Sequence, residues 1–286
     1  GIILWLVLSI SGRFRATYSQ WRDNFFIGAF MLLGGNGLVV WAEQEIPSGV
    51  ATLIISLNSI FVVIAEWILV TRWWKRWFRP ARDKETVLQN VDDAAARPTL
   101  LTILGLILGV VGLLILVWPS IGVEGTGSLP LMRVLALIAA CVSWTIGSLA
   151  NRGLSNPADP FSGSAMQMLG GGVWLAFVGL VLGETRQWSW AGISIESWLA
   201  WLYLLVAGSL VAFTTFVWLM KHCSATTVST YAYVNPIVAV FLGWWILSEE
   251  IDARVIMAAA IIIGAVAMIT ISKQRQAKTD RLPEEE

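Results

Sequence analysis

The sequence predicts an all-α polytopic membrane protein with about nine spanning segments. Of its 286 residues, 57% are hydrophobic and 13% are charged, whereas soluble domains carry roughly a quarter charged residues. The apolar residues lie in long runs, and a run of roughly 20 crosses the hydrocarbon core as a helix. The Lys and Arg residues are concentrated in alternate connections between these runs. These observations exclude the class of soluble enzymes.

The apolar runs give one partial and eight fuller candidates for spanning helices. The partial run covers 2–11, which is about half a spanning length. Because the chain begins inside this run without an initiator Met, we expect the sequence to be a fragment that lacks earlier residues. The fuller candidates are 25–42, 47–70, 99–118, 131–151, 161–183, 198–220, 225–247 and 254–272.

The basic residues predict which connections face the cytoplasm, because Lys and Arg accumulate on that side of membrane proteins. When alternate connections are assigned to opposite sides, sixteen of the 19 Lys and Arg fall on one side, and only Arg133, Arg186 and Arg254 fall on the other. This distribution places the connection 71–98 and the tail 273–286 in the cytoplasm. We therefore expect a multi-pass protein of a cell membrane, the bacterial inner membrane in particular, with a cytoplasmic C-terminus.

A weak internal repeat appears when the chain is shifted along itself by 177 residues. The identical pairs are Val40 with Val217, Trp41 with Trp218, Asn58 with Asn235, Ile60 with Ile237, Val63 with Val240, and Trp67 with Trp244. By the charge distribution the segments 47–70 and 225–247 run in opposite directions, so the two copies are inverted. Inverted repeats recur in secondary transporters, in which two equivalent halves alternate access to a midplane site. The repeat therefore predicts a transporter, and a duplicated membrane protein without transport activity is the alternative.

Several segments carry a resemblance to a known family. These are GNGLVVWAEQ at 35–44, IPSGVA at 46–51, SWTIGS at 143–148 with Arg152, AMQML at 165–169, GE at 183–184 and VNP at 234–236. In them the chain resembles the drug/metabolite transporter superfamily, and within it the EamA-type permeases. The resemblance covers nearly the whole chain and is more specific for the family than for a substrate.

The resemblance implies ten helices in two inverted five-helix repeats, with about nine of the ten helices present here and the first one missing. The expected organisation is a first repeat at 1–118 containing the cytoplasmic loop 71–98, a second repeat at 119–272, and a cytoplasmic tail at 273–286. Two features depart from the family pattern. The loop 71–98 is longer than the usual short turn, and Ser59 stands where a proline matching Pro236 is expected.

Polar residues inside apolar segments are the candidates for a substrate site, because a polar group in hydrocarbon is costly unless it faces a partner or water. Residues three or four apart share one helix face, which groups Thr227, Tyr231 and Asn235 on one helix and Trp144, Ser148 and Asn151 on another. The predicted substrate-binding residues are Asn36, Asn58, Trp144, Ser148, Gln167, Trp218, Thr227, Tyr231 and Asn235. Pro236 is a candidate gating residue, because proline frees a backbone carbonyl one turn earlier. The alternative to substrate binding is a structural role, in which the hydroxyls bond to carbonyls of their own helix and the amides form hydrogen bonds between helices.

Amides, a phenol and indole rings suit a small organic solute with an apolar or aromatic body. No Walker motif is present, so ATP is not expected to drive the protein directly, and no cofactor or metal is expected. The expected partners are this solute and the lipid bilayer, and no nucleic acid is expected. The sequence does not decide whether the chain forms a homodimer. Export of a small metabolite by alternating access is the preferred function. A membrane scaffold or sensor that docks through 71–98 is the alternative, and an intramembrane enzyme is disfavoured because the single histidine, His222, lies in a connection.

Overall fold

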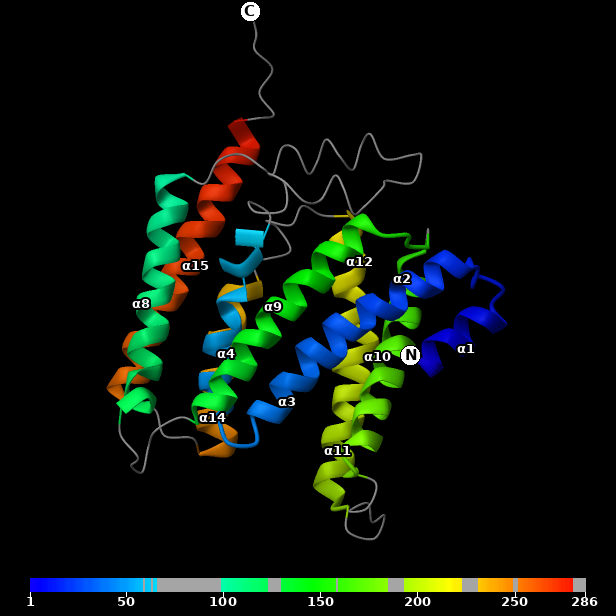
Figure 1. The fold of residues 1–286 in the computed structure, drawn as a ribbon, viewed down its shortest axis with the longest axis horizontal. Helices are drawn as coiled ribbons and strands as arrows, with labels where there is room; N and C mark the ends of the chain where they lie inside the picture. The colour runs from blue at the N-terminus through cyan, green and yellow to red at the C-terminus, as the bar shows by residue number, and fades with distance from the viewer. Residues whose placement is uncertain are drawn as a thin grey trace, which may run out of the picture. The chain divides into compact units, whose positions relative to one another are not determined.

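The computed structural model describes residues 1–58, 60–62, 64–65, 99–122, 130–157, 159–184, 193–222, 231–248 and 252–279. Within these ranges the chain is helical and contains no strand (Figure 1), which confirms the all-α prediction. The elements are α1 (Ile2–Ile10), α2 (Tyr18–Gly28), η1 (Ala29–Gly37), α3 (Leu38–Ala42), α4 (Ser48–Ser56), α8 (Leu100–Gly122), α9 (Leu131–Gly153), α10 (Pro160–Val181), α11 (Ile195–Tyr203), η5 (Leu204–Phe213), α12 (Thr214–His222), α14 (Tyr231–Leu247) and α15 (Ala253–Thr279). The elements η1 and η5 are π-helical.

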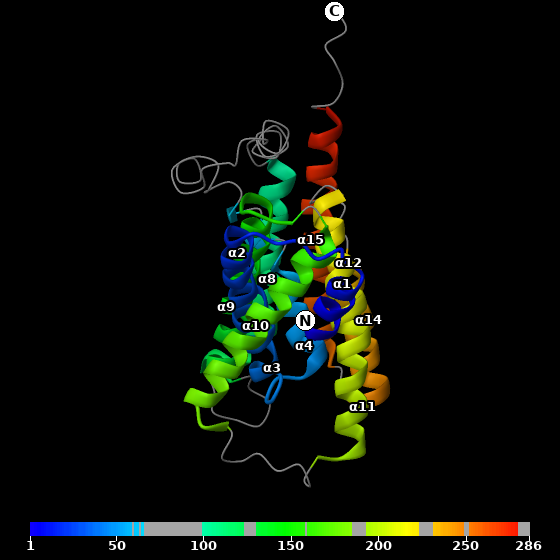
Figure 2. The same ribbon diagram turned by 90° about the vertical axis from the view of Figure 1, so that its right-hand side faces the viewer.

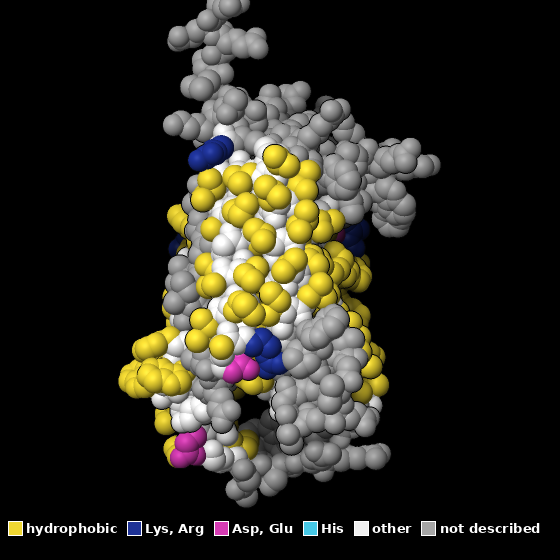
Figure 3. Space-filling view, turned by 90° about the vertical axis from the view of Figure 1, so that its left-hand side faces the viewer, with side chains coloured by type: hydrophobic (Ala, Val, Ile, Leu, Met, Phe, Trp, Pro, Cys, Tyr) yellow, Lys and Arg dark blue, Asp and Glu magenta, His cyan; other side chains and the backbone are white. Residues whose placement is uncertain are grey.

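Five of the described helices are long and apolar enough to cross a membrane. They cover Tyr18–Ala42, Leu131–Asn151, Pro160–Val181, Ile195–Leu219 and Ala253–Ser272. Figure 3 shows the face formed by α8 and α15, on which hydrophobic side chains fill the middle and charged side chains lie towards the ends. Such a belt suits a surface in contact with lipid. The prediction of a multi-pass membrane protein is therefore confirmed, whereas the predicted loop 71–98 lies outside the described residues.

The chain divides into two compact units by its internal contacts. Unit 1 contains 1–34 and 147–228, and unit 2 contains 35–146 and 229–286. Each unit takes segments from both predicted repeats, so the units do not coincide with the repeats. The predicted repeat boundary at 118 is not tested by this division and stays a prediction.

Unit 1 is held together by close approach of helix backbones. Helix α2 packs against α10, and α10 also contacts α1 and α12. A Cβ atom at Gly28 would collide with the backbone carbonyl of Gln167 and lie 2.7 Å from the Gly171 nitrogen, and one at Gly170 would lie 2.8 Å from the Phe25 Cα. Apolar burial gives no driving force inside lipid, so small residues that allow such contact stabilise helix pairs there.

Unit 2 contains two packed pairs of helices, α8 with α15 and α4 with α14 (Figures 1 and 2). Glycines again allow the close approach, since a Cβ at Gly105 would lie 2.6 Å from Ile269 and one at Gly112 would lie 2.7 Å from Ile262. The core of this unit is apolar and includes the fully buried side chains of Leu53 and Leu137. The two long helices of the pair α8 and α15 are thereby held in fixed register.

The helix that starts at Tyr18 begins earlier than the sequence predicts. Hydropathy places the start at 25, because the first turn of the observed helix is polar. The start is fixed by Thr17, whose side chain accepts a hydrogen bond from the Gln20 nitrogen at 3.4 Å, while the Thr17 nitrogen donates to the Gln20 side chain at 2.9 Å. This reciprocal capping box satisfies backbone donors that a helix start leaves open. The prediction for the helix start at 25 is therefore wrong by seven residues.

Candidate functional site

Four amide side chains meet inside unit 1. They belong to Asn24 of α2, Asn151 of α9, Asn156 of the α9–α10 connection and Gln167 of α10. Gln167 Nε2 donates to Asn24 Oδ1 at 2.8 Å and to Asn151 Oδ1 at 3.1 Å, and Asn156 Nδ2 donates to Asn151 Oδ1 at 3.0 Å. We call these four residues the amide cluster. Asn24 and Gln167 are fully buried, so the cluster is an interior polar site.

Helix caps position two members of the cluster. Asp159 caps α10 by accepting from the Phe161 and Ser162 nitrogens, and Pro160 occupies the first turn. Proline is favoured there because its fixed φ suits a helix start and no N–H is lost. Gln167 lies two turns into α10, and Asn24 lies two turns into α2, which Thr17 caps.

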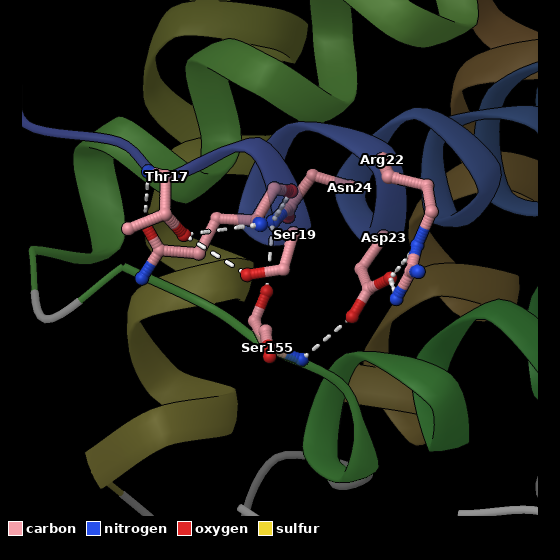
Figure 4. A network of polar contacts seen from close by, with 7 residues as sticks. Thr17, Ser19, Arg22, Asp23, Asn24 and Ser155 are labelled. Carbon is pink, nitrogen blue, oxygen red and sulfur yellow. Dashed lines mark hydrogen bonds and ion pairs between the residues drawn. The ribbon is translucent and has the colours of Figure 1, made fainter.

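The connection between α9 and α10 is fastened to α2 by polar contacts (Figure 4). The Asp23 carboxylate accepts from the Ser155 nitrogen at 3.1 Å and pairs with Arg22 at 2.7 Å. Asn24 Nδ2 donates to the Ser155 carbonyl at 3.3 Å, and Gln20 Nε2 donates to the Asn156 carbonyl at 3.3 Å. These contacts tie the ends of three helices to one another. Asp23 is buried, and its ion pair with Arg22 offsets the cost of burying the charge.

The amide cluster is not saturated with hydrogen bonds. Three buried atoms in the cluster, Asn151 Nδ2, Asn156 Oδ1 and Gln167 Oε1, have no protein partner, and neither has Ser148 Oγ, one turn before Asn151 on α9. A buried polar atom without a partner costs about 1 to 3 kcal/mol. Unpaired atoms concentrated in one place therefore mark a site for a ligand or for ordered water, because scattered packing defects would not gather at one cluster.

A pair of aromatic rings joins α2 and α10 beside the glycine crossing. Trp174 of α10 stacks against Phe25 of α2 with ring centroids 5.3 Å apart and an interplanar angle of 42°. The Trp174 Nε1 donor is buried and has no partner. Phe25 directly follows Asn24 of the amide cluster, so the aromatic pair adjoins the cluster at the same interface of α2 and α10.

Among the predicted site residues, Gln167 belongs to the amide cluster, together with Asn151, which shares the predicted face of Ser148. Ser148 itself lies one turn before Asn151 on α9. The sequence did not identify Asn24 or Asn156 as members. Asn24 was missed because it precedes the predicted helix start at 25, although the capping pattern Thr17-x-x-Gln20 was a readable signal for an earlier start. Asn156 lies in a connection, where no helical spacing identifies it.

Unit 2 holds other predicted residues, and one of them has a clear partner. Asn58 Oδ1 accepts a hydrogen bond from Thr145 Oγ1 of α9 at 2.9 Å, which fits an amide that joins two helices. Asn36 on η1 and Asn235 on α14 are exposed, and Trp144 on α9 is partly buried. Helix α14 begins at Tyr231 and includes Pro236.

The remaining predicted positions are Trp218 and Thr227, of which Trp218 belongs to unit 1. Trp218 is 40% exposed on α12, whereas Thr227 lies outside the described residues. On α4 the hydroxyls follow the structural alternative, since Thr52 donates to the Ser48 carbonyl at 2.9 Å and Ser56 to the Leu53 carbonyl at 2.7 Å. These bonds satisfy each hydroxyl within its own helix.

An ion pair closes one end of unit 2. Arg133 at the start of α9 pairs with Glu45, donates to the Trp41 carbonyl at 2.6 Å and lies 3.7 Å above the centroid of the Trp41 ring. A guanidinium over an indole ring adds a cation–π attraction to the ion pair. In the part of the chain that the structure describes, no three His, Cys, Asp or Glu side chains are grouped for a metal.

Comparison with known proteins gives a family match. Residues 1–77 and 131–271 match the model of the EamA-like transporter family. A relative in Escherichia coli K12, the uncharacterized inner membrane transporter YedA, is 28% identical over 274 residues, which span 96% of this chain and 78% of the relative. The uncharacterized transporter YoaV of Bacillus subtilis is 21% identical over 278 residues, covering 96% of this chain and 84% of the relative.

Two further similarities extend this comparison. A WAT1-related chloroplastic protein of Arabidopsis thaliana is 27% identical over 167 residues, which cover 58% of this chain and 40% of the relative. One solved crystal structure matches with a TM-score of 0.59 at 17% identity and covers 96% of this chain and 84% of the other. At that identity the match supports the fold alone.

Proposed function

The chain belongs to the EamA-like transporter family, and from this membership we propose that it is a secondary transporter that exports a small organic metabolite or amphipathic compound by alternating access. Membership makes it a membrane transporter and favours transport over catalysis. The direction of transport, the class of solute and the mechanism are our proposals. The name of the relative YedA supports a bacterial inner membrane as the location.

The observation that carries this proposal is that two helices, which start at Tyr18 and Ile195, have matching starts and matching π-helical segments. The shift of 177 residues that aligns Trp41 with Trp218 also aligns the helix starts Tyr18 and Ile195. Both starts are capped by a hydroxyl, since Ser194 accepts from the Ser197 nitrogen at 3.2 Å as Thr17 does from Gln20. The sequence identities alone did not extend this far towards the N-terminus.

Both helices also change to π-helical geometry at matching positions. Shifting Ala29–Gly37 by 177 residues gives 206–214, which overlaps Leu204–Phe213. In each copy a regular α-helix follows, α3 in one and α12 in the other. π-helical segments are rare and occur frequently at functional sites, so two at equivalent positions support a common role.

The direction of the helices in unit 1 supports inversion. In Figure 1 the chain descends along α2, whereas it rises from α11 to α12. Two inverted copies that both contain a π-helical segment can each adopt the conformation of the other. Such an exchange is the basis of alternating access in many secondary transporters. We propose that the two π-helical segments are the points at which each copy bends during this exchange.

The solute is proposed to contact polar and aromatic side chains on the spanning helices. Asn36, Trp144, Trp218 and Asn235 are the proposed contacts among the described residues. Their amide and indole groups suit a solute with an apolar or aromatic body and a few hydrogen-bonding groups. Thr227 and Tyr231 remain proposed contacts, and Pro236 remains the proposed gating residue.

The test is solute counterflow in proteoliposomes. Vesicles containing purified protein are loaded with unlabelled solute, and uptake of the same radiolabelled solute is followed for a panel of small metabolites with apolar or aromatic bodies. An alternating-access transporter gives transient accumulation that depends on internal solute. Uptake that internal solute does not stimulate would contradict the mechanism, because a channel or a scaffold gives no exchange.

Gly208→Ala is expected to slow counterflow about fivefold. Alanine favours a helical backbone over glycine by about 1 kcal/mol, which corresponds to about that factor in rate if η5 must rearrange. The site has room, because the nearest atom to a Cβ there is Leu204 Cδ2 at 3.8 Å. Gly264→Ala in α15 is the matched control, since a Cβ there meets nothing within 4 Å. Equal rates for both variants would argue against bending at η5.

A further inference from the structure

Two of the unpaired oxygens, those of Gln167 and Asn156, belong to amides that both contact the Asn151 side chain. Within an amide group the oxygen and nitrogen are about 2.2 Å apart by covalent geometry. Because Gln167 Nε2 and Asn156 Nδ2 lie 3.1 Å and 3.0 Å from Asn151 Oδ1, the unpaired oxygens of both side chains lie within about 5 Å of that atom. Ser148 is one turn before Asn151 on the same face of α9. Three unpaired atoms, Gln167 Oε1, Asn156 Oδ1 and Asn151 Nδ2, thus belong to side chains that meet at Asn151, and the fourth, Ser148 Oγ, lies one turn earlier on the same helix.

Burial limits the ligand to a small one. Gln167 is fully buried, Ser148 is 7% exposed, and the four unpaired atoms are themselves inaccessible. On one side the space is closed, because a Cβ at Gly28 would collide with the Gln167 carbonyl. A metabolite does not fit against such a backbone crossing, so the ligand is of the size of an ion or a water molecule.

The unpaired atoms favour a cation over an anion. Three of the four are oxygens, from Ser148, Asn156 and Gln167, and only the Asn151 nitrogen is a donor. The cluster lies at the C-terminal end of α9, where the partial negative charge of a helix attracts cations. The neighbouring helix starts, which would attract an anion, already carry the Thr17 and Asp159 caps.

The charge of the cluster favours a monovalent cation. Its ligand set contains amides and a hydroxyl but no carboxylate, and Asp23 is already paired with Arg22. Divalent ions in proteins are usually held by carboxylates, whereas neutral oxygens at helix ends coordinate Na⁺ in secondary transporters.

We propose that the amide cluster binds one sodium ion through Gln167 Oε1, Asn156 Oδ1 and Ser148 Oγ. A water molecule completes the coordination and accepts a hydrogen bond from Asn151 Nδ2. This site lies wholly within unit 1 and goes beyond the proposed function, because it concerns an ion and not the exported solute. A bound Na⁺ stabilises the junction of α2, α9 and α10. The stability of this junction then depends on the Na⁺ concentration.

Binding of ²²Na⁺ to the purified full chain in detergent tests the proposal, measured by scintillation proximity. We expect saturable binding of one ion per chain that unlabelled Na⁺ displaces and choline does not. Ser148→Ala should raise the half-saturating concentration about tenfold, since one ligand is lost. This variant should fold, because the Ser148 hydroxyl has no protein partner to lose. Thr102→Ala, which removes a buried hydroxyl from unit 2, is the control and should bind as the wild type does.

A thermal measurement gives a second readout. The melting midpoint of the wild type should rise by about 3 °C or more when choline chloride is replaced by NaCl at saturation, and Gln167→Leu should show no such rise whatever its basal midpoint. Absence of saturable ²²Na⁺ binding, together with equal midpoints in both salts, would overturn the proposal and leave water as the occupant. Equal displacement by K⁺ would overturn the assignment to sodium. None of these readouts depends on transport. The counterflow result therefore tests the proposed function separately from the proposed sodium site.

Discussion

Gly28→Ala is expected to disrupt the packing of unit 1 and to leave little monodisperse protein after extraction. The added Cβ meets the backbone carbonyl of Gln167 and the backbone nitrogen of Gly171. Neither atom can move away by a change of rotamer, so α2 and α10 must separate along their crossing. Overpacking against flexible side chains already costs about 1 to 3 kcal/mol, and a clash with backbone exceeds this range.

The effect should reach the amide cluster. Gln167 donates its hydrogen bonds to Asn24 and Asn151 from the helix that would be displaced. The measurement is the melting midpoint and the yield of monodisperse protein in detergent. Gly172→Ala on α10 is the matched control, because a Cβ at Gly172 meets nothing within 4 Å. We expect that control to keep the wild-type midpoint or to raise it slightly through better helix propensity. A wild-type midpoint for Gly28→Ala would contradict the close crossing.

Asn235→Leu is expected to remove most counterflow, by tenfold or more, while the protein still inserts. Asn235 is exposed on the apolar helix α14, and an amide that faces hydrocarbon is costly. We propose that it faces the water-filled solute pathway, where leucine removes a hydrogen-bonding group from the solute. A structural amide in a bilayer contributes only about 0.6 kcal/mol on average, too little to explain a tenfold loss of rate.

Asn58→Leu provides the comparison, since Asn58 is the matching residue of the other copy. Its side chain already accepts from Thr145, so we expect a loss of stability and a milder loss of transport. Pro236→Ala should slow exchange with less effect on solute binding, because alanine restores a backbone donor within α14. The measurement is the counterflow rate divided by the amount of inserted protein. Full activity of Asn235→Leu would remove this residue from the pathway.

The spanning helices could be predicted because hydropathy alone reveals them. The repeat was inferred from Trp and Asn identities, which stand out among apolar residues, and it stays a prediction. The matched starts at Tyr18 and Ile195 were not predicted, since a polar first turn lowers hydropathy there. Thr17 and Ser194 did carry the capping signal. The π-helical segments are apolar, as membrane-spanning α-helices are, so hydropathy does not distinguish them.

The candidate site was predictable only in part. Gln167 and Ser148 stood out as polar residues inside apolar segments, and the structure places Gln167 in the amide cluster and Ser148 one turn before its member Asn151. Asn24 and Asn156 became visible only when α2 and the α9–α10 connection were brought together, because that contact joins residues more than 130 positions apart. Long-range contacts of this kind leave no trace in the local spacing of a single sequence.

The most direct test of the inverted repeat is the accessibility of two matched positions, Ser19 and Glu196. They lie at the starts of the equivalent helices, 177 residues apart, and both are exposed. In a chain whose two native cysteines, Cys141 and Cys223, are replaced by alanine and serine, Ser19→Cys and Glu196→Cys are each treated with a membrane-impermeant maleimide in intact cells and in inverted vesicles. The account predicts that Glu196→Cys reacts in intact cells and Ser19→Cys reacts in inverted vesicles. Labelling of both positions from the same side would show that the copies are parallel and would contradict alternating access by inverted halves.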